Sequence, residues 1–131
     1  GLGLALFEEG LAEEAAKEYR TAIALDPKSA LAHNNLGYFF LDRGNPDAAA
    51  PEFREAIRLD PRIASAHYGL ALALLGTLSP AMPASARLSL LNAACRELNS
   101  DVTLAPGDRK AEAEIHSMDR LLPSGQRCLP P

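Results

Sequence analysis

The sequence predicts an all-α fold, an α-solenoid built from antiparallel helix hairpins. Ala and Leu supply most of an apolar fraction of 47%, whereas aromatic residues make up only 5%, a balance that favours helices packed closely through small side chains. The second observation is a repeat, because Pro27 and Pro61 stand 34 residues apart and their neighbours recur at the same offset. A fixed period of this length indicates stacked helical units, each of which reads as two antiparallel helices.

The repeat extends well beyond the two prolines. The positions that match at this offset include Gly10 with Gly44, Ala15 with Ala49, Tyr19 with Phe53, and Leu25–Pro27 with Leu59–Pro61. The following helix keeps the register, since His33 recurs as His67. A single hairpin cannot bury both of its faces, so we expect neighbouring units to stack in order.

The second unit contains its own start and stop signals. Its first helix is predicted from about Ser29 to Arg43, and Gly44 suits the left-handed residue that ends a helix. Asn45 can cap the next helix and Pro46 can take its first position, where the missing N–H costs nothing. That helix is expected to end before Asp60-Pro61, because proline disfavours helical geometry in its predecessor.

The same unit carries a recognisable motif, His33-x2-Leu36-Gly37-x2-Phe40, then Ala49-x3-Phe53, then Pro61. This motif resembles the tetratricopeptide repeat, with histidine in place of the leading aromatic residue. The resemblance implies a right-handed superhelix whose concave side is lined by the first helix of each unit.

We therefore expect about three such repeats and a C-terminal helix. The expected divisions are a first repeat, N-terminally truncated, at 1–29, a second at 30–63, a divergent third at 64–101, a linker and capping helix at 102–122, and a disordered tail at 123–131. The third unit diverges because Gly76–Pro83 is a long, proline-rich connection. Its second helix resumes near Ser85, with Ala86, Leu90 and Ala93 as the expected apolar stripe. Asp108 is expected to cap a last helix that ends at about Leu122.

The resemblance places the partner-binding groove on the outward side chains of the first helices. The candidate groove residues are Leu4, Phe7, Asn34, Tyr38, Leu41, Tyr68, Leu72 and Leu75. Tyr38 and Tyr68 are the main candidates, because tyrosine combines a large contact area with one polar tip. The alternative, that both tyrosines only pack between repeats, stays open.

Some tetratricopeptide domains hold a peptide's terminal carboxylate with a cluster of lysine, arginine and asparagine. This sequence keeps only Asn35 at a matching place, whereas Leu4, Ser65 and Gly69 occupy the others. Capture of chaperone tails is therefore not expected.

Composition argues against several other functions. A net charge of −4 argues against a nucleic-acid partner, and no run of apolar residues is long enough for a membrane span. We expect no metal, cofactor or catalytic site, since His33, His67 and His116 have no ligand partners at suitable spacing. Cys95 and Cys128 read as free thiols. A disulfide between them is the less favoured alternative and would require an oxidising compartment.

These observations predict a protein–protein interaction scaffold, not an enzyme, that accepts a peptide or partner segment in its concave groove. Two alternatives are a regulatory or substrate-presenting arm of a larger enzyme and a module that forms homo-oligomers through open repeat ends. The compartment stays undetermined. A cytoplasmic location is favoured, and a periplasmic one would follow if an upstream signal had been removed.

Overall fold

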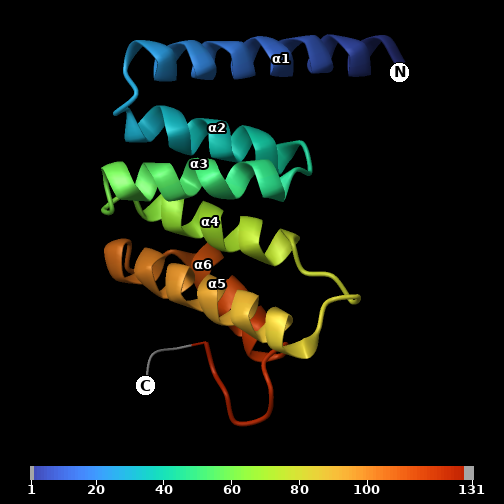
Figure 1. Ribbon diagram of the computed structural model, residues 1–131, viewed down its shortest axis with the longest axis vertical. Helices are drawn as coiled ribbons and strands as arrows, with labels where there is room; N and C mark the ends of the chain where they lie inside the picture. The colour runs from blue at the N-terminus through green and yellow to red at the C-terminus, as the bar shows by residue number, and fades with distance from the viewer. Residues whose placement is uncertain (1, 129–131) are drawn as a thin grey trace.

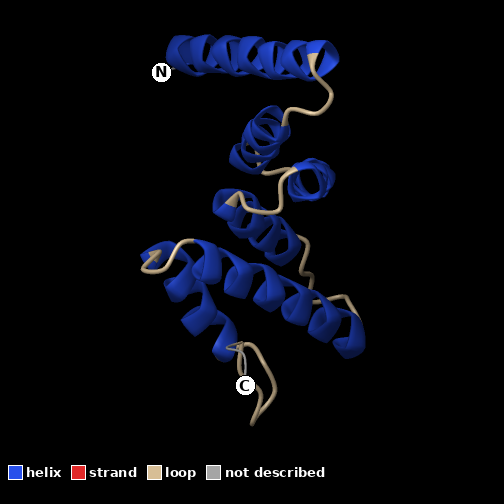
Figure 2. Ribbon diagram, turned by 90° about the vertical axis from the view of Figure 1, so that its left-hand side faces the viewer, coloured by secondary structure: helices blue, strands red, loops and turns tan. Residues whose placement is uncertain are grey.

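The structure is a computed structural model that describes the backbone of residues 2–128 and the side chains of residues 9–128. The described residues form helices and loops, with no strand among them (Figure 2). The helices are α1 (Leu2–Leu25), α2 (Ala30–Asp42), α3 (Pro46–Leu59), α4 (Ala64–Gly76), α5 (Ala84–Leu104) and α6 (Arg109–Asp119). They stack along the long axis of the molecule from α1 to the paired α5 and α6 (Figure 1). The predicted all-α solenoid is confirmed.

The first complete hairpin, α2 and α3, follows the predicted start and stop signals. The Ser29 hydroxyl caps α2 by accepting a hydrogen bond from the Ala32 amide at 3.2 Å. Gly44 follows the helix with a φ of 71°, a conformation that glycine adopts without strain. The Asn45 side chain then caps α3, and Pro46 is its first residue.

Phe53 of α3 is the centre of the packing between the two hairpins. Its side chain is fully buried, and the ring of Tyr38 meets its ring edge to face with centroids 4.9 Å apart. The ring lies against the backbones of α2 and α4 at two glycines. A Cβ atom added to Gly37 or Gly69 would come within 2.7 Å or 2.3 Å of it. Each helix therefore approaches Phe53 at a residue that has no side chain.

The recurring histidines hold each unit to the turn before it. Each imidazole contacts a glutamate of the next helix through Nδ1 and a proline carbonyl six residues earlier through Nε2. The contacts are His33 with Glu52 (2.8 Å) and Pro27 (3.3 Å), and His67 with Glu97 (2.6 Å) and Pro61 (2.8 Å). Both histidines thus stabilise the hairpin geometry.

The first unit departs from the expected hairpin. Residues 2–25 form one continuous helix, α1, which passes through Gly10 without a turn. The cause lies in the neighbouring residues. Gly44 is followed by Asn45 and a proline, whereas Gly10 is followed by Leu11-Ala12, which contain no capping side chain and no proline.

The helix α5 also differs from expectation in register and length. Its buried residues are Leu91, Ala94, Cys95, Leu98 and Asp101, one position away from the expected stripe of Ala86, Leu90 and Ala93, which are half-buried. The shift follows from the loop at 77–83, which breaks the 34-residue register. Because no proline closes the unit, the helix continues beyond 101 to Leu104.

The structure describes the C-terminal segment as far as residue 128, and residues 129–131 of the expected tail lie outside the described residues. The helix α6 ends at Asp119 instead of Leu122, and the chain then folds back so that Cys128 forms a disulfide with Cys95. The Cys128 amide donates to Asp119 Oδ1 at 2.7 Å, and its carbonyl accepts from Asn99 Nδ2 at 2.6 Å. The prediction of free thiols is wrong. The spacing of two distant cysteines carries no signal of their pairing.

None of the described helices combines the length and hydropathy that crossing a bilayer requires.

Candidate functional site

The predicted groove contains a pocket of about 450 Å³, formed by α2, α4, the end of α5 and the start of α6. Its lining residues are Tyr38, Ala64, Ser65, Tyr68, Asp101, Ala105, Asp108 and Lys110. The first helices of two successive hairpins therefore supply one wall, and the C-terminal elements supply the other. The pocket combines aromatic surface with charged groups, a composition typical of ligand sites.

The wall formed by α2 and α4 is held by hydrogen bonds between the two helices. The Tyr38 hydroxyl donates to the Ser65 carbonyl at 2.5 Å, and Asn34 Nδ2 donates to the Ser65 hydroxyl at 3.1 Å. Burial raises the pKa of the Tyr38 hydroxyl, so this group remains a neutral donor. Tyr38 therefore packs between repeats and lines the pocket at the same time.

Tyr68 contributes the second aromatic surface from α4. Its side chain is partly exposed, and burial is the main reason that its pKa is raised. Unlike Tyr38, it makes no ring-to-ring contact with Phe53. Its ring is therefore the more available of the two for a ligand.

The opposite wall carries two carboxyl groups in contact. Asp101 is only 1% exposed, and its Oδ2 has no hydrogen-bond donor among the described residues. Burial, followed by a hydrogen bond with Asp108, raises the pKa of Asp101 to about 7. The same hydrogen bond lowers the pKa of Asp108, which also caps α6 by accepting from the Lys110 amide at 3.0 Å. In the free protein Asp101 therefore holds a proton that it shares with the ionised Asp108 below about neutral pH.

The other predicted groove residues do not line this pocket or have side chains outside the described residues. Leu41 and Leu75 are half-buried against the core, and Leu72 is also half-buried. None of the three lines the pocket. Leu4 and Phe7 belong to α1, but their side chains lie outside the described residues.

The acidic wall lies outside the predicted groove, because the resemblance places the groove on the first helices alone and the last helix is expected to be a cap. One signal was present, because Asp101 stands three residues after Leu98 on the buried stripe of α5. A carboxylate on an apolar stripe is a candidate for a buried charged group.

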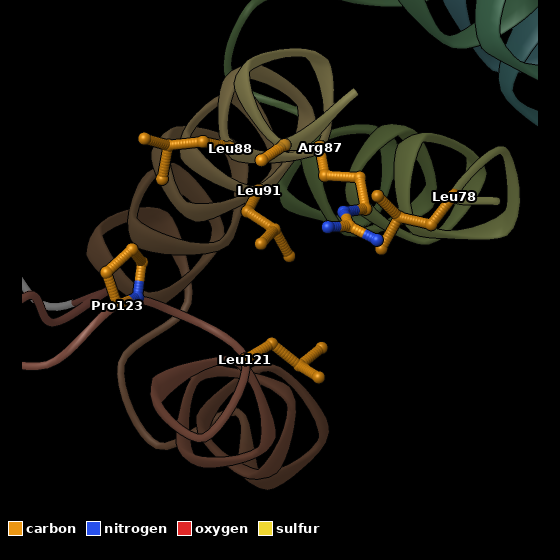
Figure 3. A pocket seen from close by; sticks show the side chains of 7 residues that line it. Leu78, Arg87, Leu88, Leu91, Leu121 and Pro123 are labelled. Carbon is orange, nitrogen blue, oxygen red and sulfur yellow. The ribbon is translucent and has the colours of Figure 1, made fainter. Parts of the chain in front are cut away.

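A second pocket, of about 340 Å³, lies away from this groove, between the α4–α5 loop, the start of α5 and the segment after α6 (Figure 3). Its lining residues are Leu78, Ala84, Arg87, Leu88, Leu91, Leu121 and Pro123. The lining is apolar except for Arg87, whose side chain lies beside Leu78 (Figure 3). It contains no pair of interacting polar groups.

Comparison with solved structures finds similar folds. The first tetratricopeptide domain of Spaghetti (RPAP3) bound to an HSP90 peptide is 18% identical, with a TM-score of 0.73, over 91% of this chain and 86% of that one. The second such domain of human RPAP3, in complex with an HSP70 peptide, is 26% identical, with a TM-score of 0.69, over 88% of each chain. A MamA RS-1 double mutant is 22% identical, with a TM-score of 0.70, over 91% of this chain and 61% of that one.

Comparison with protein families and curated proteins gives two matches and one negative result. A model described as TPR repeat matches residues 3–41, and one described as Tetratricopeptide repeat matches residues 40–102. No curated protein matches the chain significantly. The two models together follow the stacked hairpins from α1 through most of α5, and the chain belongs to the tetratricopeptide-repeat family.

Proposed function

We propose that the chain is a non-enzymatic interaction module that binds a peptide segment of another protein on the face formed by α2, α4 and the start of α6. The observation that carries this proposal is the pocket that Tyr38 and Tyr68 line between the first helices. Tyrosine loses few rotamers on binding and is enriched at the energetic centres of interfaces. The fold supports the proposal because two of the similar domains were solved with bound peptides.

The bound segment is expected to differ from a chaperone tail. At the positions where a carboxylate clamp would need long side chains, Gly69 has none and faces Phe53, and the Ser65 hydroxyl accepts from Asn34. Asn35 alone matches the clamp. The ionised Asp108 lies on one wall, and Lys110 is the one cationic side chain in the lining. A terminal carboxylate would therefore meet an anion and a single cation there instead of a set of cationic donors.

Peptide display on the immobilised protein tests the proposal. Random 12-residue peptides are selected, and the strongest is labelled and titrated by fluorescence anisotropy. Tyr68→Ala is expected to weaken its binding by about tenfold or more, as the loss of an aromatic anchor does. The matched control is Leu25→Ala, which truncates a side chain that is 83% exposed and lies at the end of α1. Equal affinity of the Tyr68 and Leu25 variants would reject the groove.

The HSP90 peptide SRMEEVD of the similar structure tests the chemistry of the groove separately. It is expected to bind at least about tenfold more weakly than the selected peptide. Tight binding of SRMEEVD that is lost in Asn35→Ala would contradict the argument against a carboxylate clamp.

A second candidate function, self-association through exposed apolar side chains of α1 and α2, is favoured by one observation. Leu11, Leu25 and Leu31, in α1 and at the start of α2, are exposed. Light scattering over a range of protein concentrations tests this candidate. A monomer at all concentrations would exclude it and leave the peptide-binding proposal unaffected.

A further inference from the structure

The two carboxyl groups on the wall of the pocket form no ion pair with the described residues, although Lys110 lines the same pocket and lowers the pKa of Asp108. The ion pairs of the described residues involve neither Asp101 nor Asp108. The Oδ2 atom of Asp101 is buried without a donor, on the wall of a pocket large enough for a side chain. Once Asp101 has released the proton that it shares with Asp108, its buried Oδ2 has no donor, so a ligand that supplies one is favoured.

We infer that this wall receives an arginine side chain of the bound peptide, with the guanidinium group donating to Asp101 and Asp108. The inference rests on the proposed peptide-binding function, because it names the chemistry that the same groove recognises.

The geometry favours a guanidinium over other donors. Its planar fork presents several N–H groups at once, which suits two carboxylates in contact with each other. Tyr38 and Tyr68 line the same pocket and offer ring faces, on which guanidinium groups stack readily. A lysine ammonium has no plane to stack and can direct its donors less well at both groups.

The charged groups around the pair determine how binding depends on pH. His67 lowers the pKa of Asp101, Lys110 lowers that of Asp108, and Tyr38 and Tyr68 remain neutral because their own pKa values are raised. A guanidinium binds more strongly when both carboxyl groups are ionised, because hydrogen bonds between opposite charges are the stronger ones. Binding therefore favours release of the proton that Asp101 holds below about pH 7. Affinity for arginine should rise between pH 6 and pH 8.

The experiment uses three small probes, Nα-acetyl-arginine methylamide and its citrulline and lysine counterparts. Citrulline has nearly the same shape as arginine and carries no charge, so the pair isolates the cation. Each probe is titrated into the ¹⁵N-labelled protein, and the amides of Ala64, Ser65 and Ala105 report on the pocket. The arginine probe is expected to shift these amides and to bind about tenfold more tightly than the citrulline probe at pH 8.

Two variants assign this preference to the carboxyl pair. Asp108→Asn removes a charge but keeps a residue that caps helices well, so α6 should remain folded. Asp101→Asn removes the buried carboxyl. Each is expected to reduce arginine binding at pH 8 by about fivefold or more, and Asp101→Asn should also abolish its rise between pH 6 and pH 8. The control is Glu112→Gln, an exposed residue in the first turn of α6 that is not in the pocket lining.

The outcomes separate this inference from the proposed function. Equal binding of the arginine and citrulline probes, or of the arginine and lysine methylamides, would overturn the arginine assignment. Selected peptides that bind through Tyr68 without any basic residue would also overturn it and leave the peptide groove intact. Arginine binding that depends on Asp101, in a protein to which no displayed peptide binds, would retain the cation site and reject the peptide-binding function.

Discussion

The hairpins α2–α3 and α4–α5 have the same construction and differ in what fixes them. The helices α2 and α3 are joined by a short turn at Gly44-Asn45, and α3 stops at Leu59 before a proline. The helices α4 and α5 are joined by the loop 77–83, and α5 is 21 residues long where α3 has 14. Local sequence signals determine the first hairpin. The second is packed against α6 and is linked to the C-terminal segment by a disulfide.

The same difference separates the residues that form the regular scaffold from those that supply charged groups to the candidate site. Asp101 and Ala105 lie in the last turn of α5 and just after it. The irregular hairpin thereby reaches α6 and contributes the acidic wall of the pocket. The regular repeats form the frame, and the irregular hairpin contributes charged groups. Four changes test this division.

Truncation of Phe53 should give the largest effect. Phe53→Ala removes a fully buried ring that both hairpins contact, and it is expected to lower the free energy of unfolding by about 3 to 5 kcal/mol in urea titrations. The comparison in the second hairpin is Leu91→Ala, which should cost about 2 to 3 kcal/mol because Leu91 borders the second pocket. A larger loss for Leu91 would mean that the irregular hairpin, not the regular one, contains the main core.

Loss of the disulfide should follow in size. Reduction of Cys95–Cys128 opens a loop with a sequence separation of 33 residues, for which loop-closure entropy predicts a loss of about 3 to 4 kcal/mol. Thermal unfolding with and without dithiothreitol measures it. A Cys95→Ser/Cys128→Ser variant is the control, since its unfolding temperature should not respond to the reductant. Equal unfolding temperatures of the oxidised and reduced wild-type protein would show that non-covalent contacts alone hold α6 and the segment after it in place.

The carboxyl pair should give a smaller effect that depends on pH. The pKa of Asp101 is raised in the folded state, so this group stabilises the fold at low pH, and the contribution disappears as pH rises toward about 7. Asp101→Asn removes the charge that forms there and should stabilise the protein by about 1 to 2 kcal/mol at pH 8. The advantage should shrink toward pH 4. Urea titrations of the variant and the wild-type protein at both pH values measure this advantage. The same difference in unfolding free energy at pH 4 and pH 8 would contradict the expectation.

Replacement of Gly10 should give the smallest change in stability. It is also the only one of the four changes that should raise stability equally at all pH values. In a continuous α1 a Cβ atom at this position meets nothing within 4 Å, so Gly10→Ala should stabilise the helix by about 0.5 to 1 kcal/mol. At Gly44 the same change should destabilise the protein, because the φ there is positive. Thermal unfolding of both variants decides the point. A loss at Gly10 would indicate a turn like that at Gly44.

The regular part of the fold could be predicted because its signals are local. Ser29, Gly44, Asn45 and Pro46 each act within one turn of the chain, and the structure confirms all four. The asparagine that caps α3 is the kind of signal that requires no knowledge of distant segments.

The remainder could not be predicted because it depends on contacts between distant residues. The pairing of Cys95 with Cys128 is decided by how the tail returns to α5, which no local pattern encodes. The acidic wall forms because the chain turns back after α5 and brings Asp108, the N-cap of α6, to Asp101. At Gly10 the repeat register was misleading. Gly10 matches Gly44 at the 34-residue offset, but the residues that follow the two glycines differ.

The disulfide closes a covalent loop that contains α6, and this loop determines which helices should unfold first. In a repeat protein each unit contacts only its neighbours, so end units can detach one at a time. One end of this array is fastened by a bond that thermal motion does not break, and the other consists of α1 on α2. Partial opening should therefore proceed from α1 toward α6. Amide protons in α1 would exchange first, and the pocket beside α6 would persist while the N-terminal helix detaches.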